Sequence, residues 1–314
     1  MGSKKIQYGV IGVGYLGQYH VQNLLNISHV DVVGIYDIDN KRAKEMSQKY
    51  KVKNYQNLEK LLNDAEAVSI VSPTTTHQDT ALNALNHNCH IFIEKPISDQ
   101  IASAHQILKK VKTTNKVAHV GHIERFNPAF DAFMKTKHEP LFVECHRLTQ
   151  INSRSMDISV VLDLMIHDID LLLHMIDAPI KEIIADGISV ISNSIDLANI
   201  KLIFENGCVA NLTASRVSNK DMRKIRVFEH NCYTSIDLLN KDLIQYTASP
   251  DADSKNLQFQ NTTIKIKKYD ALTRELTHFC DSIIDNDSNM QNIEKAIRAL
   301  EVAEKINMII KNKI

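Results

Sequence analysis

The feature that most constrains the fold of this chain is a glycine pattern placed between a strand and a helix. A largely apolar run at 6–11 is followed by Gly12-Val13-Gly14-Tyr15-Leu16-Gly17, and a helical pattern then continues to Leu25. In this setting the first glycine permits a tight turn, the second lets the backbone approach a pyrophosphate, and the third lets the helix pack on the strand. The helix N-terminus offers N–H groups to the phosphates. The pattern therefore predicts a Rossmann-type unit that binds a dinucleotide.

An acidic residue in the expected place indicates which dinucleotide. A second strand predicted at 30–36 ends in Asp37, twenty residues after Gly17. A carboxylate there hydrogen-bonds the adenosine ribose hydroxyls and repels a 2′-phosphate, so we expect NAD, with NADP less favoured because Lys41 and Arg42 lie nearby. The alternative for Asp37 is an N-cap of the helix that contains these two basic residues.

Strands and helices continue to alternate through the first part of the chain. Apolar runs that predict strands occupy 67–71, 90–93 and 117–120, and helical patterns occupy 43–50, 57–62, 77–87 and 100–112. This alternation is typical of βαβ units and a parallel sheet. Because ligands bind outside the carboxyl ends of such strands, we expect a ligand site where they end.

Two of these strand ends carry polar segments. Ser72-Pro73-Thr74-Thr75-Thr76-His77 follows one strand, and Glu94-Lys95-Pro96 follows the next. Small hydroxyl side chains suit contacts with the ribose or nicotinamide, although capping of the following helix by Thr75 or Thr76 explains them equally well. A lysine at this edge lies close to a bound cofactor and substrate, where desolvation and nearby charge tune its pKa. For the tripeptide taken alone, a solvated lysine beside a turn is the simpler interpretation.

The composition changes after about residue 122, where strand patterns follow one another with few helices between them. They occupy 142–147, 180–191, 197–204, 209–216, 225–229, 233–238 and 262–268, with a hairpin turn predicted at Glu205-Asn206-Gly207. Such a sheet is largely antiparallel. With 314 residues the chain is long enough for two domains. We predict an α/β Rossmann domain at 1–122 and an α+β domain at 123–314 with a large, mostly antiparallel open sheet.

A helix predicted at 162–176 carries polar residues within an otherwise apolar sequence. Asp163, His167, Asp170 and His174 recur at spacings of four, three and four, which places them on one stripe. Such a stripe faces either solvent or a functional site. The two histidines and two aspartates span three turns of helix, so we do not expect them to bind a metal.

Taken together, these motifs resemble the Gfo/Idh/MocA family of oxidoreductases. The resemblance rests on the glycine loop, Asp37, the Ser-Pro-Thr segment with His77, Glu94-Lys95-Pro96 and Arg125-Phe126-Asn127-Pro128. Members are NAD(P)-dependent enzymes that oxidise or reduce sugars, sugar nucleotides and cyclitols in a cleft between two domains. The resemblance implies that Lys95 lies between nicotinamide and substrate.

The resemblance also implies roles in the second domain. The family signature there is an aspartate followed four residues later by a histidine, and Asp163 and His167 match it. His167 is then the expected general acid/base, and Asp163 positions the substrate or tunes the proton transfer. Many members place a glycine pair ahead of this aspartate, whereas Ser159-Val160-Val161 stands here. That departure argues against a simple transfer of glucose or inositol specificity.

Within the family, the segments 121–128, 157–170 and 213–216 most resemble the UDP-N-acetylglucosamine 3-dehydrogenase branch. This implies oxidation of a sugar hydroxyl at C3 of such a sugar nucleotide. Another sugar, a uronic-acid sugar nucleotide or a cyclitol is the alternative substrate, and a non-catalytic dinucleotide or sugar sensor is the alternative class of protein. Guanidinium groups suit a diphosphate, and surface salt bridging explains each arginine equally well when it is taken singly. The arginines concerned are Arg125, Arg147, Arg154 and Arg216. The expected substrate contacts are Arg125, Asn127, Arg154, Asp163, His167 and Arg216.

The site predicted by these arguments holds NAD and no metal. The expected catalytic residues are Lys95, His167 and Asp163. The expected cofactor contacts are Gly12, Gly14, Tyr15, Leu16, Gly17, Asp37, Ser72, Pro73, Thr74, His77, Glu94 and Lys95.

Composition limits the partners of the protein. Lys+Arg and Asp+Glu both number 37, so no net field favours nucleic acid or an anionic membrane. The five scattered cysteines and the lack of a signal-peptide pattern predict reduced thiols in a cytoplasmic protein. The resemblance, rather than composition, implies the partners expected here: a small-molecule sugar or sugar nucleotide, and further copies of the chain in a homodimer or homotetramer formed through the open face of the sheet.

Overall fold

The computed structural model describes residues 5–151, 158–250, 257–287 and 290–313. They divide into two compact units: residues up to 123 together with 270–298, and residues 124–269 together with 299 onward. The sequence patterns predict a second domain over all of 123–314, whereas the structure places 270–298 in the first unit. The reason is the apolar face of α8 (Ala271–Ile284), because Leu276 and Phe279 on that face belong to the core of the first unit.

Five parallel strands form the sheet of the first unit, in the order β2-β1-β3-β4-β5. They are β1 (Ile6–Ile11), β2 (Val30–Tyr36), β3 (Ala67–Ile70), β4 (His90–Glu94) and β5 (Ala118–Gly121). The strand order reverses between β1 and β3, which is where open α/β sheets bind their ligands. Ile11 pairs with Ile70, and Ile70 with Ile93, so the segments after β1, β3 and β4 leave the sheet at one edge. The predicted Rossmann fold is confirmed.

Helices cover both faces of this sheet. They include α1 (Gly17–Leu24), α2 (Asn40–Tyr50), α3 (Leu58–Asp64), α4 (His77–Asn86), α5 (Ile101–Thr114) and α8, and α9 (Gln291–Lys311) runs on into the second unit. Successive residues of a strand point to opposite faces. Tyr8 of β1 accordingly packs in the core with α1 and α8, whereas a Cβ added to Gly9 would lie 2.9 Å from Leu61 of α3.

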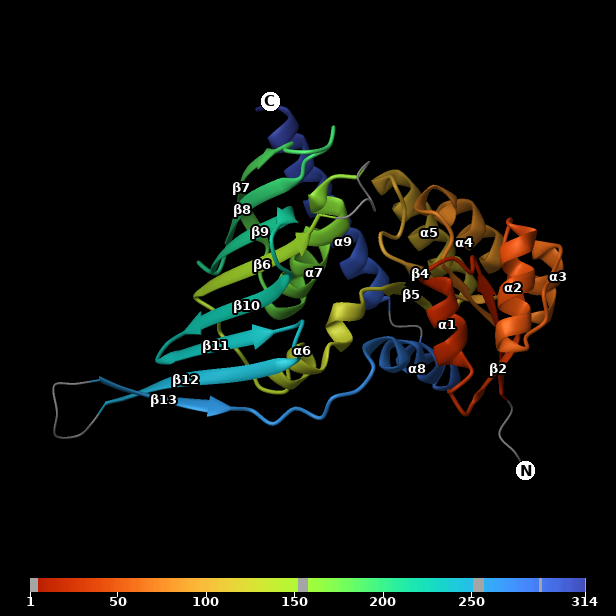
Figure 1. Cartoon of the computed structure of the whole chain (residues 1–314), viewed down its shortest axis with the longest axis horizontal. Helices are drawn as coiled ribbons and strands as arrows, with labels where there is room; N and C mark the ends of the chain where they lie inside the picture. The colour runs from red at the N-terminus through yellow and green to blue at the C-terminus, as the bar shows by residue number, and fades with distance from the viewer. Residues whose placement is uncertain (1–4, 152–157, 251–256, 288–289, 314) are drawn as a thin grey trace. The chain divides into compact units, whose positions relative to one another are not determined.

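Eight strands form the sheet of the second unit, in the order β13-β12-β11-β10-β6-β9-β8-β7 (Figure 1). They are β6 (Phe142–Gln150), β7 (Ile180–Ile188), β8 (Leu197–Phe204), β9 (Val209–Ser218), β10 (Met222–Glu229), β11 (Cys232–Asp237), β12 (Asp242–Pro250) and β13 (Leu257–Thr263). Neighbouring strands are antiparallel except β6 and β9. This confirms the mostly antiparallel sheet.

The edge of this sheet differs from the prediction. The strand predicted at 262–268 lies instead at 257–263, and β12 was not predicted. The two strands pair with each other from Ile244 with Thr263 onward, so backbone bonds between them stabilise a stretch whose side-chain pattern is weak.

One face of this sheet carries a row of aromatic side chains. Phe142, Phe228, Tyr233 and Tyr246 stand directly opposite one another on four adjacent strands, with ring centroids 6.0, 4.9 and 5.1 Å apart. Their chain neighbours Val143 and Val227 are fully buried, and the aromatic residues are partly exposed. The row therefore lies on the face turned away from the core.

Helical segments pack against the second sheet. They are α6 (Pro128–Phe133), a π-helical turn at Val161–Met165 and α7 (Ile166–Met175), which continues directly from that turn. The first packs on β11 and β12, and the π turn packs on β9. In the ranges that the structure describes, no helix is both long and apolar enough to cross a bilayer.

Candidate active site and cofactor cradle

A hollow of about 680 Å³ opens at the carboxyl ends of the first strands of the first unit. Its walls include many of the predicted cofactor contacts, namely Gly12, Gly14, Tyr15, Leu16, Asp37, Ser72 and Pro73. Ile38, which is 90% exposed, lies on the rim and offers an apolar surface of the kind that an adenine ring contacts. Ile38 was not among the predicted site residues, although its place directly after Asp37 could have indicated a position beside the adenosine.

The three glycines of the loop have the different surroundings that a pyrophosphate site requires. A Cβ on Gly12, where φ is +84°, would lie 2.7 Å from the Ser72 nitrogen, and one on Gly17 would lie 1.9 Å from the Gly12 oxygen. A Cβ on Gly14 would meet nothing within 4 Å. The first and third glycines therefore permit close packing of backbone, and the second leaves the open side that a phosphate can approach. The residues present fit a dinucleotide.

Asp37 is held in place by backbone donors. The Val13 N–H donates to Oδ2 at 2.8 Å, and the Asp39 N–H donates to Oδ1 at 2.8 Å. The N-cap of α2 is Asp39, whose side chain accepts bonds from the backbone of Lys41 and Arg42, so the structure excludes the capping alternative for Asp37. The Arg42 guanidinium lies 3.5 Å from an Asp37 carboxylate oxygen and 3.3 Å from one of Asp39, so two carboxylates offset its positive charge.

His77 connects two loops at the edge of the sheet where the hollow opens. Its ring nitrogens lie 2.9 Å from the Ser72 carbonyl oxygen and 3.0 Å from that of Pro96. Burial lowers the pKa of His77, and the two carbonyl oxygens act in the opposite direction. Its position between the Ser72 and Lys95-Pro96 segments favours a structural contribution to the cradle.

The loop between β3 and α4 is braced by its own hydroxyl groups. The Thr76 Oγ1 donates to the Pro73 carbonyl at 2.8 Å and lies 2.7 Å from the Ser72 Oγ. Thr76 is the N-cap residue of α4, yet its side chain makes no capping bond. The hydroxyls at 72 and 76 therefore shape the wall of the hollow.

Lys95 follows β4 at the same edge as the glycine loop, and its side chain is partly buried. The peptide bond between Lys95 and Pro96 is cis. The preceding Glu94 is turned into the unit, where its Oε1 lies 3.0 Å from the His20 Nε2. The structure thus brings Lys95 to the predicted strand end and gives Glu94 a contact on α1.

The second unit contains the predicted acid/base pair. Asp163 lies in the π turn, His167 follows in the first turn of α7, and both side chains are partly buried. Single π turns within helices occur frequently at functional sites. The predicted polar stripe is broken beyond this pair, because Asp170 is fully buried.

Buried ion pairs surround α7. The Arg125 Nε donates to Asp170 Oδ2 at 2.7 Å, and its Nη2 contacts the other carboxylate oxygen. Arg147 donates to Asp168 at 2.8 Å and to Glu124 at 2.8 Å. Burial alone lowers the pKa of the Arg147 guanidinium, but the two carboxylates raise it above its usual value. In this structure both arginines have carboxylate partners within their own unit.

Asn127 also has partners inside the second unit. Its Oδ1 accepts a bond from the Ala129 N–H at 3.1 Å and caps α6. Its Nδ2 donates to Glu124 at 3.0 Å and to the Leu238 carbonyl at 2.9 Å. These bonds tie the start of α6 to the turn after β11.

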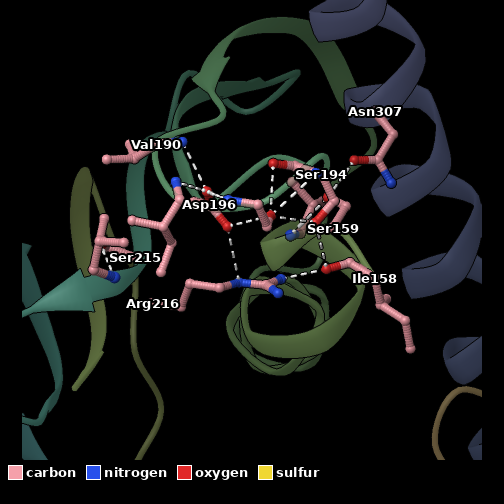
Figure 2. A network of polar contacts seen from close by, with 12 residues as sticks. Ile158, Ser159, Val190, Ser194, Asp196, Ser215, Arg216 and Asn307 are labelled. Atoms are coloured by element: carbon pink, nitrogen blue, oxygen red, sulfur yellow. Dashed lines mark hydrogen bonds and ion pairs between the residues drawn. The ribbon is translucent and has the colours of Figure 1, made fainter. Parts of the chain in front are cut away.

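Figure 2 shows the network that holds the segment leading into the π turn. Asp196 accepts bonds from the backbone N–H groups of Val190, Ile191 and Ser192 at 2.7–2.9 Å. Burial alone raises the pKa of Asp196, but these bonds and that of the Ser192 hydroxyl hold it below its usual value. The Arg216 Nε lies 3.7 Å from this carboxylate.

Arg216 connects this anchored loop to the chain just before the π turn. Its Nη2 donates to the Ile158 carbonyl oxygen (Figure 2). The next residue, Ser159, donates to Asn307 at 2.7 Å and accepts a bond from the Val161 N–H at 3.1 Å. Arg216 therefore fixes the backbone a few residues ahead of Asp163. The remaining predicted arginine, Arg154, lies outside the described residues.

Metal ligands were not predicted at this site. Among the residues that the structure describes, no three His, Cys, Asp or Glu side chains gather into a metal-binding group. All five cysteines are free thiols, and burial raises the pKa of Cys89 and Cys208 to about 11.

The first unit has a parallel sheet whose strand order reverses, a glycine loop with room for a pyrophosphate, and an aspartate that follows β2. Together these features define a dinucleotide-dependent oxidoreductase of the Rossmann class. Comparison with known families agrees: the oxidoreductase family with an NAD-binding Rossmann fold matches residues 6–122, and the GFO/IDH/MocA C-terminal domain matches residues 121–230. The chain belongs to the Gfo/Idh/MocA family, as the motifs predicted. It is an NAD-dependent oxidoreductase that acts on CH–OH groups.

Known relatives narrow the comparison. The chain is 34% identical to the UDP-N-acetylglucosamine 3-dehydrogenase of Acidithiobacillus ferrooxidans over 276 residues, which is 88% of each chain. A solved structure of that enzyme, GnnA, superposes with a TM-score of 0.91, covers 98% of each chain and is 31% identical. The chain is also 27% identical to the myo-inositol 2-dehydrogenase of Thermotoga maritima, over 67% of this chain and 69% of that one.

Proposed function

We propose that the protein oxidises the C3 hydroxyl of a UDP-N-acetylglucosamine-type sugar nucleotide to a ketone. The observation that carries the proposal is the similarity to a UDP-N-acetylglucosamine 3-dehydrogenase over 88% of both chains. The similarity to a myo-inositol 2-dehydrogenase is lower and spans 67% of this chain. The alternative substrates are therefore another sugar, a uronic-acid sugar nucleotide or a cyclitol.

The proposed chemistry divides among three side chains. NAD, when bound, supplies the acceptor for the hydride that leaves C3. His167 accepts the hydroxyl proton and later releases it to water, while Asp163 positions the substrate. Lys95 polarises the hydroxyl oxygen as a cation. The partly buried positions of all three support these roles, since a partly buried group can meet a substrate and still exchange protons.

The roles of the two units follow from their contents. We propose that the first unit binds NAD through the hollow at the glycine loop, and that the second unit binds the sugar nucleotide and mediates self-association. Arg125, Asn127, Arg154 and Arg216 are the proposed substrate-side residues. Arg125, Asn127 and Arg216 each make hydrogen bonds to other groups of the second unit, and each bond holds backbone or a helix in place. These bonds support an indirect role, in which the three residues shape the walls of the substrate site.

Self-association is proposed through the open face of the second sheet. The aromatic row from Phe142 to Tyr246 presents partly exposed rings across four strands. Large exposed apolar surfaces are uncommon on monomers, and a symmetric contact buries the same surface on both copies. This surface supports the proposal of a homodimer or homotetramer.

Deuterium at C3 tests both the reaction and its position. The protein is incubated with NAD and UDP-N-acetylglucosamine carrying deuterium at C3, and with UDP-N-acetylglucosaminuronic acid, UDP-glucose and myo-inositol as competing candidates. We expect UDP-N-acetylglucosamine to give the fastest formation of reduced cofactor, with the deuterium recovered in it by mass spectrometry. Reduced cofactor without deuterium would assign the chemistry to another carbon. Binding without turnover of any substrate would favour the sensor.

A further inference from the structure

A series of four hydrogen-bonded polar side chains runs through the first unit, from the buried Tyr8, Ser69 and His20 to the partly buried Glu94. The Tyr8 hydroxyl lies 2.9 Å from the Ser69 Oγ, which lies 3.1 Å from the His20 Nδ1. The His20 Nε2 lies 3.0 Å from the Glu94 Oε1. The four residues come from β1, β3, α1 and the end of β4, and the side chains of His20 and Glu94 are 1% and 15% exposed.

The last residue of this hydrogen-bonded series, Glu94, determines which nitrogen of His20 carries a hydrogen. An ionised carboxylate only accepts hydrogen bonds, so the His20 Nε2 carries a hydrogen and donates it to Glu94. The Ser69 hydroxyl lies within hydrogen-bond distance of both the His20 Nδ1 and the Tyr8 hydroxyl. Burial raises the pKa of Tyr8, so its hydroxyl keeps the proton that it donates. The bond from His20 is therefore directed at the Glu94 carboxylate.

The position of Tyr8, at the other end of this hydrogen-bonded series, excludes a proton-relay role for the series. Tyr8 is fully buried in the core between the sheet and the helices α1 and α8, so a proton passed along the chain would not reach solvent there. The chain can act only through its charge and its geometry at Glu94. Hydrogen bonds in a row polarise one another, which strengthens the last bond to the carboxylate.

The surroundings of Glu94 keep its carboxylate charged and fixed. Its Oε2 accepts a bond from the Lys95 N–H at 3.2 Å. A Cβ added to Gly121 of β5 would lie 3.0–3.1 Å from the three carboxyl atoms, so this glycine leaves room for the group. Burial works against the charged form, yet the hydrogen bond and the charge of His20, followed by the charge and the N–H of Lys95, lower the pKa of Glu94.

We propose that His20 and Glu94 are a positioning pair for Lys95: His20 holds the Glu94 carboxylate in place, the carboxylate accepts a bond from the Lys95 N–H, and its negative charge favours the ammonium form of that lysine. An opposite charge nearby favours the charged form of a group. Lys95 then polarises the substrate oxygen and leaves proton removal to His167, an assignment that rests on the proposed function. The first turn of α1 thereby connects the glycine loop to the catalytic lysine. Glu94, expected as a cofactor contact, acts here through its neighbour.

A measurement on the protein without substrate tests the pair directly. Isotope-coded acetic anhydride labels neutral amines, and mass spectrometry of the Lys95 peptide across a pH series gives the midpoint of its reactivity. In Glu94→Gln we expect this midpoint to fall by about one pH unit, because the neighbouring negative charge is lost. His20→Leu should lower the midpoint in the same direction, and His20→Gln, which retains a donor, should restore it. Exposed Lys44 on α2 serves as the internal reference.

Turnover supplies the second readout. Glu94→Gln and His20→Leu should lower kcat about 10–100-fold, as misplacement of a catalytic group does, while the Kd for NAD stays within about threefold. The alkaline limb of the kcat profile should move to lower pH. His87→Leu is the matched control, since it breaks another His–Glu pair of the first unit, with Nε2 2.8 Å from Glu59, away from the crevice.

The outcomes separate the two proposals. An unchanged Lys95 midpoint in folded Glu94→Gln overturns the positioning pair, whatever the substrate is. If His20→Leu does not fold, as judged by its thermal midpoint, Glu94→Gln and His20→Gln still decide the question. If no UDP-sugar is turned over by the unmodified enzyme, the proposed substrate is wrong, and the labelling result remains valid on its own.

Discussion

Replacing Gly14 by alanine should weaken NAD binding without weakening the fold. The added Cβ would meet no protein atom within 4 Å and would project on the open side of the loop. Stability should stay level or rise slightly, because alanine loses less conformational freedom than glycine on folding, an effect worth about 0.4–1 kcal/mol. The pyrophosphate, in contrast, would lose close approach to the backbone. One lost charge-assisted hydrogen bond corresponds to about 1.5–3 kcal/mol, so the Kd for NAD should rise about 10–100-fold.

Calorimetric titration with NAD and thermal unfolding measure the two effects separately. Gly207→Ala is the matched control, because its Cβ also meets nothing within 4 Å but its φ is +87°. That variant should lose about 1–2 kcal/mol of stability through backbone strain and bind NAD normally. Gly17→Ala should impair folding, since its Cβ would lie 1.9 Å from the Gly12 oxygen. A Gly14→Ala protein that binds NAD as tightly as the unmodified protein would refute the glycine-loop argument.

Further predictions concern specificity, catalysis and assembly. Asp37→Ala should narrow the preference for NAD over NADP in calorimetric titrations, and tighter binding of NADPH than NADH by the unmodified protein would contradict the role of Asp37. His167→Ala and Lys95→Ala should each lower turnover about 10²–10⁴-fold with NAD binding retained, and the two losses should not add. A base works only when unprotonated, so activity of the unmodified enzyme should fall as pH drops, and full turnover by His167→Ala would place the base elsewhere. Replacing Phe228 and Tyr233 together by serine should shift light scattering toward the monomer, whereas an unmodified protein that is already monomeric would disprove the interface.

Local sequence patterns predicted much of the fold of the first unit and part of the candidate site. The glycine loop needs only its own backbone, the strand before it and the helix after it, so six residues predict a turn, a helix start and an anion site together. Asp37 is identified by its distance along the chain from that loop. Lys95 is identified because an apolar strand ends just before it. The family and the cofactor followed from these short-range features, and both are confirmed.

Long-range packing decided what short patterns could not. Asp170 has the spacing of a site residue, yet it is buried against Arg125, 45 residues away in the sequence. The helix α8 has the pattern of any amphipathic helix, and only the core around Phe279 shows that it belongs to the first unit. The strand β12 depends on partners on both sides for its backbone bonds.

The sequence by itself determined the class of the protein, because a dinucleotide cradle is built from contiguous residues whose chemistry can be read in order. The contact between His20 and Glu94 joins residues 74 positions apart, and no sequence pattern links the two. Hydrogen bonding and charge act over a few ångströms in space, whatever the separation along the chain. The tertiary structure therefore decided which polar groups meet.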